Sequence, residues 1–139
     1  MTAKKIGVAI LFIVGAGVAY AENPSSLIAG YTAEAARATP GFAPSAERGQ
    51  GLFMRKWGVS KTMPSCATCH NDQPTAEGKH VVTSKRIAPL SPAVNQKRFT
   101  DLAKVEKWFG RNCKEVVGRE CSAAEKADFI QFVSKGSQI

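Results

Sequence analysis

The spacing of apolar residues predicts an all-α protein that begins with a helix. The first apolar stripe recurs at helical spacing and comprises Leu27, Ile28, Tyr31 and Ala35. This is the period of one helix face. Asn23 followed by Pro24 is a typical helix start, and Thr39-Pro40-Gly41 interrupts the pattern. We therefore expect a first helix from Asn23 to about Ala38.

Two further segments have the same helical period. Ser45 should cap a second helix, with an apolar edge made of Leu52, Phe53 and Trp57. Gly49 and Gly51 lower the intrinsic propensity of this helix, but a glycine here also allows another helix to approach closely. Near the end of the chain, Ser122 and Glu125 form a capping box. The helix that it opens has one apolar face: Phe129, Ile130 and Val133.

The helix expected after Thr100 has a polar residue in its apolar stripe. Thr100 is its expected N-cap, and Asp101 lies favourably at its positive end. At about 100° per residue, five side chains fall within about 80°: Leu102, Val105, Phe109, Asn112 and Val116. A buried amide without a partner costs about 1–3 kcal/mol. Something polar should therefore face Asn112. The opposite face has a basic stripe: Lys104, Lys107, Arg111 and Lys114.

Residues 1–21 have the pattern of a cleaved export signal. Lys4 and Lys5 precede an apolar run of about a dozen residues, and Ala19-Tyr20-Ala21 is a typical cleavage site. The run is too short for a membrane anchor, which needs about 20 apolar residues. We expect a soluble chain, residues 22–139, that forms a single domain in the periplasm.

The charge of this exported chain is basic. Without Lys4 and Lys5, 17 Lys and Arg side chains face 11 Asp and Glu side chains, a net charge of +6. Nucleic acid is excluded outside the cytoplasm, and a membrane association is not expected after cleavage. An acidic redox protein is the partner that this charge favours.

The chemistry of the chain centres on Cys66-Ala67-Thr68-Cys69-His70. C-x-x-C-H is the attachment signature of a c-type haem, in which both thiols form thioethers and the histidine ligates the iron. A zinc site would need a second Cys/His pair at similar spacing, and a thioredoxin-like motif would need a reducing compartment. We therefore expect one covalent haem c at Cys66 and Cys69, with His70 as axial ligand.

The residues leave the sixth iron ligand open. Met63 precedes the motif and no methionine follows it, so a methionine ligand is not expected. Met54 is expected in the core. Three possibilities remain: Asn112, His80 or no sixth ligand. The stretch 71–96 is rich in proline and glycine and should be a loop, in which the Pro89 carbonyl is a candidate acceptor for the His70 ring N–H.

The two remaining cysteines, Cys113 and Cys121, should form a disulfide in an oxidising compartment. Gly118 between them permits a turn. In the chain-entropy model, closing the nine-residue loop contributes about 2.5 kcal/mol. The bridge could be a structural staple alone, but it also begins next to Asn112 and would hold that side chain in place.

Several stretches resemble the sphaeroides haem protein (SHP) family over nearly the whole exported chain: Leu27-Ile28-Ala29-Gly30-Tyr31, Ile87-Ala88-Pro89-Leu90, Arg98-Phe99-Thr100-Asp101, Gly110-Arg111-Asn112-Cys113 and Val117-Gly118-Arg119-Glu120-Cys121. The resemblance implies a class I cytochrome c fold, oxygen binding, and Asn112 as sixth ligand beside a disulfide. It also implies a dihaem cytochrome c as electron donor. The related cytochrome c double prime has histidine at the position of Asn112, and its residue at the position of His80 is not a ligand. Ser84 departs from the family pattern, which has glycine there.

Three hypotheses for function follow. The first is a cytochrome whose sixth ligand, Asn112, leaves on reduction, so that ferrous haem binds oxygen, nitric oxide or carbon monoxide. An amide oxygen is a hard donor, tolerable for ferric iron and poor for ferrous iron. The second is a plain electron carrier with a permanent sixth ligand. The third is a haem enzyme that oxidises nitric oxide or reduces oxygen or peroxide, although no residue indicates a substrate.

Overall fold

Helices dominate the fold, as the apolar pattern predicts. The computed structural model describes residues 22–136, so the expected export signal lies outside the described part. The elements, in chain order, are α1 (Pro24–Ala38), α2 (Ala46–Met54), α3 (Ala67–His70), β1 (Gly78–Lys79), β2 (Arg86–Ile87), α4 (Leu102–Val116) and α5 (Ala123–Lys135). Within residues 22–136, no helix has the length and apolar character needed to cross a membrane.

Local capping residues set the starts of the helices, and three of the predicted caps are confirmed. The Asn23 side chain accepts from the Ser26 N–H at 2.9 Å, and the Ser45 hydroxyl accepts from the Arg48 N–H. At α5, Ser122 and Glu125 form the predicted capping box. Each cap satisfies backbone N–H groups that have no partner inside the helix.

Two predictions at helix ends are wrong. Asp101, not Thr100, caps α4, because its carboxylate accepts from the Lys104 N–H at 2.9 Å. The Thr100 hydroxyl instead donates to the Lys97 carbonyl. The second helix ends at Met54, so Trp57 lies beyond it. Met54 itself is 39 % exposed rather than part of the core.

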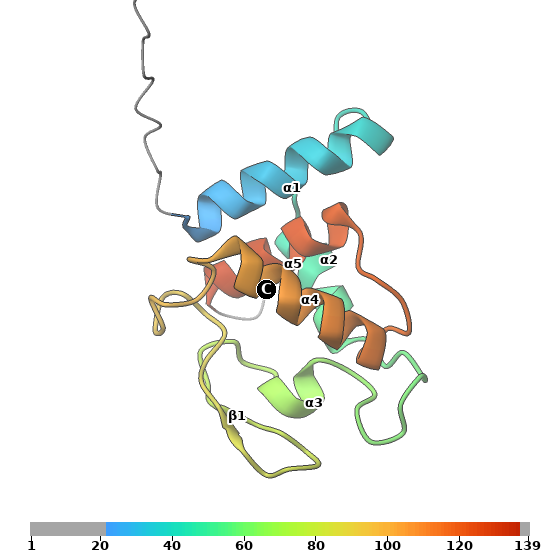
Figure 1. The fold of residues 1–139 in the computed structure, drawn as a ribbon, viewed down its shortest axis with the longest axis vertical. Coiled ribbons are helices and arrows are strands. Elements are labelled where there is room, and N and C mark those ends of the chain that lie inside the picture. The colour runs from blue at the N-terminus through green and yellow to red at the C-terminus, as the bar shows by residue number, and fades with distance from the viewer. Residues whose placement is uncertain (1–21, 137–139) are drawn as a thin grey trace, which may run out of the picture.

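α5 is the centre of the core. It packs against α1 and α2, and Figure 1 shows it behind α4. Ile130, Phe132 and Val133 are fully buried on it, and the Phe53 ring of α2 lies 5.5 Å from the Phe132 ring. A Cβ on Gly49 would stand 2.0 Å from the Asp128 carbonyl oxygen. The predicted close approach at Gly49 is thus confirmed, and its neighbour is α5.

α4 is attached to α1 and α5 through Glu106 and Phe109. Glu106 accepts a hydrogen bond from the Tyr31 hydroxyl and forms an ion pair with Lys126 at 2.7 Å. The Phe109 ring makes edge contacts with Tyr31 at 6.3 Å and with Phe129 at 5.4 Å. In Figure 1, α4 crosses the middle of the molecule, with α1 above it and α3 below it. One flank of α4 therefore faces α1 and α5.

The predicted loop contains a short hairpin. β1 and β2 pair antiparallel, with Gly78 opposite Ile87 and Lys79 opposite Arg86. A Cβ on Gly78 would stand 2.2 Å from the Cys69 carbonyl oxygen and 2.8 Å from the His70 Cα. The base of the hairpin is therefore pressed against the end of α3, where only glycine fits.

Candidate haem site

The motif residues lie on and just before the short helix α3. The Cys66 carbonyl accepts from the His70 N–H at 3.1 Å, which closes the helical turn. This turn places Cys66 and Cys69 three positions apart on one side of the helix. Neither cysteine forms a disulfide, and both are half-buried. Their two thiols are therefore available for two thioether bonds to one planar group.

The surroundings of these cysteines bury one thiol and, within residues 22–136, supply no set of zinc ligands. Burial raises the pKa of the Cys66 thiol to about 11; its backbone hydrogen bond opposes this shift and Cys69 adds to it. The free thiol is thus neutral near pH 7. Within residues 22–136, no group of three His, Cys, Asp or Glu side chains could hold a metal ion.

His70 is a neutral imidazole near pH 7. Burial is the main reason that its pKa falls to about 4, and electrostatic interactions with Arg98 and His80 lower it further. A neutral imidazole keeps one ring nitrogen with a free lone pair, which is what an axial iron ligand needs. Gly78 packs closely on the His70 backbone and so restricts the position of the His70 Cα, from which the imidazole side chain extends.

The segment beside His70 is anchored by Arg98. Its guanidinium donates to the Pro89 carbonyl at 2.8 Å and to the Ala88 carbonyl. The Asn95 amide also donates to the Pro89 carbonyl, at 3.1 Å. Both lone pairs of that carbonyl therefore have donors other than His70, the donor expected from the sequence. Arg98 itself brings a positive charge to this side of the site.

Asn112 lies on α4 with a free amide. It is half-buried at the edge of the inward stripe, about 20° from the buried Val105 and about 40° from the buried Val116 around the helix. Its amide has no hydrogen-bond partner within residues 22–136. α4 runs through Gly110 without interruption. Leu102, expected in the same stripe, is 41 % exposed. The inward stripe is therefore shorter than predicted, but it includes Asn112.

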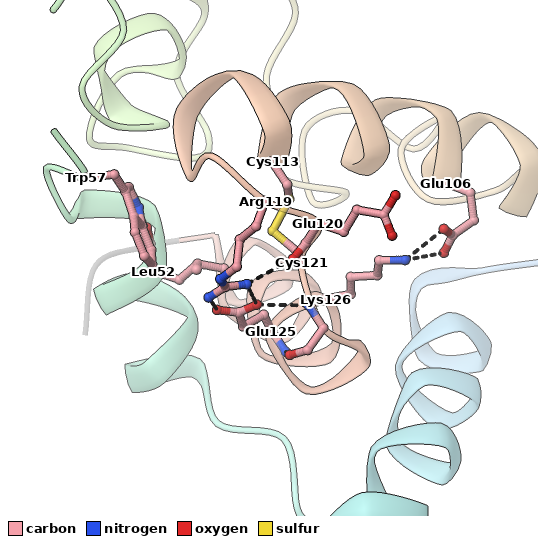
Figure 2. Close-up of a disulfide and its surroundings, with 10 residues drawn as sticks. Leu52, Trp57, Glu106, Cys113, Arg119, Glu120, Cys121, Glu125 and Lys126 are labelled. Carbon is pink, nitrogen blue, oxygen red and sulfur yellow. Dashed lines mark hydrogen bonds and ion pairs between the residues drawn. A yellow bond between two sulfur atoms is a disulfide. The ribbon is translucent and has the colours of Figure 1, made fainter. Parts of the chain in front are cut away.

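The predicted disulfide is present between Cys113 and Cys121 and begins one residue after Asn112. Its Cα atoms are 5.7 Å apart, and both cysteines are buried. Trp57 and Phe109 pack against this cluster. Figure 2 shows the bridge with Arg119 and Glu125 beside it. Gly118 has a φ of +82°, which confirms the turn expected between the two cysteines.

Trp57 covers the disulfide from outside the helix in which it was expected. The Arg55 and Arg119 guanidinium carbons lie 4.3 and 5.8 Å from the centre of its ring system. Arg119 also forms a double ion pair with Glu125, at 2.7 and 2.8 Å. These contacts tie the end of α2, the disulfide loop and the start of α5 together. The sequence does not predict these contacts, because arginine and glutamate residues of this kind occur on many protein surfaces.

His80 is occupied in its own turn. Its Nδ1 accepts from the Val82 and Thr83 N–H groups at 3.2 and 3.3 Å. In a neutral imidazole, the other nitrogen then has the proton and no free lone pair. His80 therefore organises the hairpin turn, and its hydrogen bonds compete with iron ligation.

The chain is similar to known c-type cytochromes. Residues 40–133 match the family model described as Domain of unknown function (DUF1924). The chain is 47 % identical over 128 residues to Cytochrome c-type protein SHP of Cereibacter sphaeroides, covering 90 % of this chain and 95 % of that protein. It is 43 % identical over 113 residues to Cytochrome c'' of Methylophilus methylotrophus, covering 80 % of this chain and 78 % of that one. The structure of oxidized SHP, described as an oxygen binding cytochrome c, matches with a TM-score of 0.73 and 45 % identity, over 84 % of this chain and 99 % of that chain.

Proposed function

The chain belongs to the family of c-type cytochromes that includes SHP and cytochrome c'', and from this premise we propose that it binds diatomic gases at a position that Asn112 occupies only in the oxidised state. Membership makes it a monohaem cytochrome with one covalent haem c in a class I cytochrome c fold. The identity of the sixth ligand, its release and the choice of gas are our proposal.

The donor set of α3 fits this cofactor. When bound, the haem supplies an iron that changes between ferric and ferrous states and takes ligands on both sides of its plane. Cys66 and Cys69 hold the group through thioethers. His70 offers a neutral nitrogen to one side, and Gly78 leaves its backbone no room to shift. Arg98 is placed to attract a propionate with the guanidinium N–H groups that its two carbonyl partners leave free.

The free amide of Asn112 is the observation that supports the proposal. This half-buried amide has no hydrogen-bond partner within residues 22–136 and is not sealed from solvent, so its oxygen is open to a ligand from outside the chain. The disulfide at the next residue restrains the backbone from which this side chain extends. An amide oxygen is a hard, neutral donor, which suits ferric iron and is poor for ferrous iron. Reduction should therefore release Asn112 and free its N–H₂ group to donate a hydrogen bond to an incoming gas.

The setting of this reaction is the periplasm, according to the export signal expected at residues 1–21. Electrons would come from another cytochrome there, a dihaem cytochrome c by family resemblance. The net charge of +6 on residues 22–139 favours an acidic donor. Oxygen, nitric oxide and carbon monoxide are the candidate gases, and the description of the SHP structure as oxygen binding supports oxygen among them.

Absorption spectra of three variants test the ligand assignment. Asn112→Ala should make the oxidised protein high-spin or water-ligated, with its haem still attached. Asn112→His supplies a stronger nitrogen donor and should give a low-spin oxidised form that binds carbon monoxide more slowly once reduced. His80→Ala is the control, and its spectra should equal those of the wild type. Wild-type protein reduced with dithionite should be five-coordinate and bind carbon monoxide.

The opposite pattern would support a plain electron carrier. If His80→Ala abolished six-coordination in the oxidised form and Asn112→Ala left it unchanged, Asn112 would not be the ligand. If the reduced wild type stayed six-coordinate and failed to bind carbon monoxide, the ligand would be permanent and gas binding would be excluded.

A further inference from the structure

We propose that Trp108 forms the outer wall of the gas-binding side of the haem site and selects small neutral ligands over water and hydrated anions. This inference rests on the function proposed for Asn112. It assigns a role to a residue that the sequence pattern does not mark, because Trp108 lies outside the apolar stripe of α4.

The first argument is the position of Trp108 on the helix. Trp108 precedes Asn112 by four residues, so the two side chains are neighbours on the surface of α4. At about 100° per residue, Trp108 lies about 40° from Asn112 and about 100° from Phe109. Phe109 contacts Tyr31 and Phe129. Trp108 therefore extends from the Asn112 flank of α4 rather than from the flank that packs on α1 and α5.

The second argument is that the indole is not used in the core. Trp108 is 43 % exposed, which is a large exposed aromatic surface for a residue on a well-packed helix. The other tryptophan, Trp57, packs against the disulfide. The exposed face of this ring, four positions before an amide without a partner in residues 22–136, is therefore available for a contact outside the core.

The third argument is the charge on the outer side of the ring. Lys107 Nζ and Arg111 Cζ each lie 6.0 Å from the centre of the Trp108 ring. These cation–π contacts hold the indole against the helix surface. Around the helix, Trp108 thus lies between these two cations of the basic stripe and Asn112.

The chemical consequence concerns what reaches the position beside Asn112. The indole is apolar except for one N–H donor, so a hydrated ion must lose water to pass it, whereas a neutral diatomic gas need not. The ring also keeps water from competing for the position that Asn112 leaves. Shortening this side chain should open the site to solvent without removing the ligand itself.

The test uses haem-loaded protein and three substitutions: Trp108→Ala, Trp108→Phe and Leu102→Ala. Leu102 is the matched control, since it is 41 % exposed on the same helix but lies outside the Asn112 flank. The first measurement is flash photolysis of the reduced, carbon monoxide-bound protein. Trp108→Ala should show less recombination inside the site and roughly tenfold faster binding of carbon monoxide from solution. One side chain changes ligand discrimination on about this scale. Azide should bind the oxidised form of this variant more tightly. Trp108→Phe should restore both properties, and Leu102→Ala should match the wild type.

The outcomes separate this inference from the function on which it rests. If the wild type binds carbon monoxide but Trp108→Ala has wild-type recombination and azide affinity, Trp108 is not a wall. Equal effects of Leu102→Ala and Trp108→Ala would also overturn it, because they would indicate a general loosening of α4. If the reduced wild type binds no carbon monoxide, the proposed function itself fails.

Discussion

At the scale of single residues, Ser84 shows how one backbone angle explains a departure from a family pattern. Its φ is +57°, in the left-handed region that glycine adopts at little cost. Its N–H donates to the His80 carbonyl at 2.8 Å, so the hairpin turn requires this conformation. A glycine at this position, which the resemblance to the SHP family implies, would therefore be less strained.

Replacing Ser84 with glycine should stabilise the protein. The left-handed conformation costs a residue with a side chain about 1–2 kcal/mol, and part of this gain is lost because glycine is freer in the unfolded chain. We expect Ser84→Gly to raise the free energy of unfolding by about 0.5–1 kcal/mol, measured by urea denaturation of the haem-loaded protein. Thr83→Gly, beside it and without a positive φ, should lower it. A loss of stability in Ser84→Gly would refute this account of the turn.

The chemistry of single residues was the most predictable part of the site. Cys66, Cys69 and His70 form a motif whose spacing is itself the signal, and the Cys113–Cys121 bridge follows from counting cysteines in an exported chain. Asp101 replaced Thr100 as the cap of α4: its carboxylate accepts from the Lys104 N–H, whereas a Thr100 cap would have accepted from the Leu102 or Ala103 N–H. Such choices depend on backbone angles that no local pattern specifies.

At the scale of elements, the crossing of α2 and α5 depends on Gly49. The Asp128 carbonyl oxygen would be 2.0 Å from any Cβ at this position. Asp128 also pairs with Arg48 at 2.7 Å and accepts from the Ser45 N–H. The start of α2 is thus fixed to α5 by a buried carboxylate, so the two helices have little freedom to separate.

Gly49→Ala should therefore destabilise the protein, although alanine is the better helix former by about 1 kcal/mol. The new methyl group meets backbone, which cannot rotate away, and overpacking of this kind typically costs about 1–3 kcal/mol or more. Gly51→Ala is the control, since nothing lies within 4 Å of its added Cβ; it should be neutral or stabilising by up to about 1 kcal/mol. Thermal unfolding followed by circular dichroism measures both. Equal stability of the two variants would show that the crossing tolerates a wider separation.

Element boundaries show where local patterns lose their information. The starts of α1, α2 and α5 were predictable because a cap and its partner lie within four residues. The end of α2 was not, since Trp57 continues the apolar spacing while the chain leaves the helix after Met54. The hairpin was missed because each strand has two residues, too few for any alternation.

At the scale of the whole molecule, the contacts that orient α4 join distant parts of the chain. Glu106 binds Tyr31 and Lys126, which lie 75 positions before it and 20 after it. Burial alone would raise the pKa of Glu106, but its hydrogen bonds with Lys126 and Tyr31 outweigh this and lower it. The sequence predicted the helices but not this cluster, because its members share no period or motif.

The surface charge of α4 leads to a prediction about the electron donor. Two members of its basic stripe have partners: Arg111 pairs with Glu115 and Lys114 with Glu120, each at 3.0 Å. Lys104 has no ion pair within residues 22–136, so its charge is open to a partner. Isolated exposed charges contribute little to stability, but they raise the rate of encounter with an acidic protein.

Lys104→Glu should therefore slow reduction by an acidic dihaem cytochrome c roughly threefold to tenfold at low salt, because electrostatic steering scales with the charge at the contact. Lys135→Glu, at the end of α5, changes the net charge by the same amount and should have a much smaller effect. Stopped-flow rates measured as a function of ionic strength should converge for all three proteins near physiological salt, where charges are screened over about 8 Å. If the reduction rate of the wild type does not depend on salt, the basic stripe is an ordinary solvated helix face. If both substitutions slow reduction equally, the net charge of the protein, rather than this face, attracts the donor.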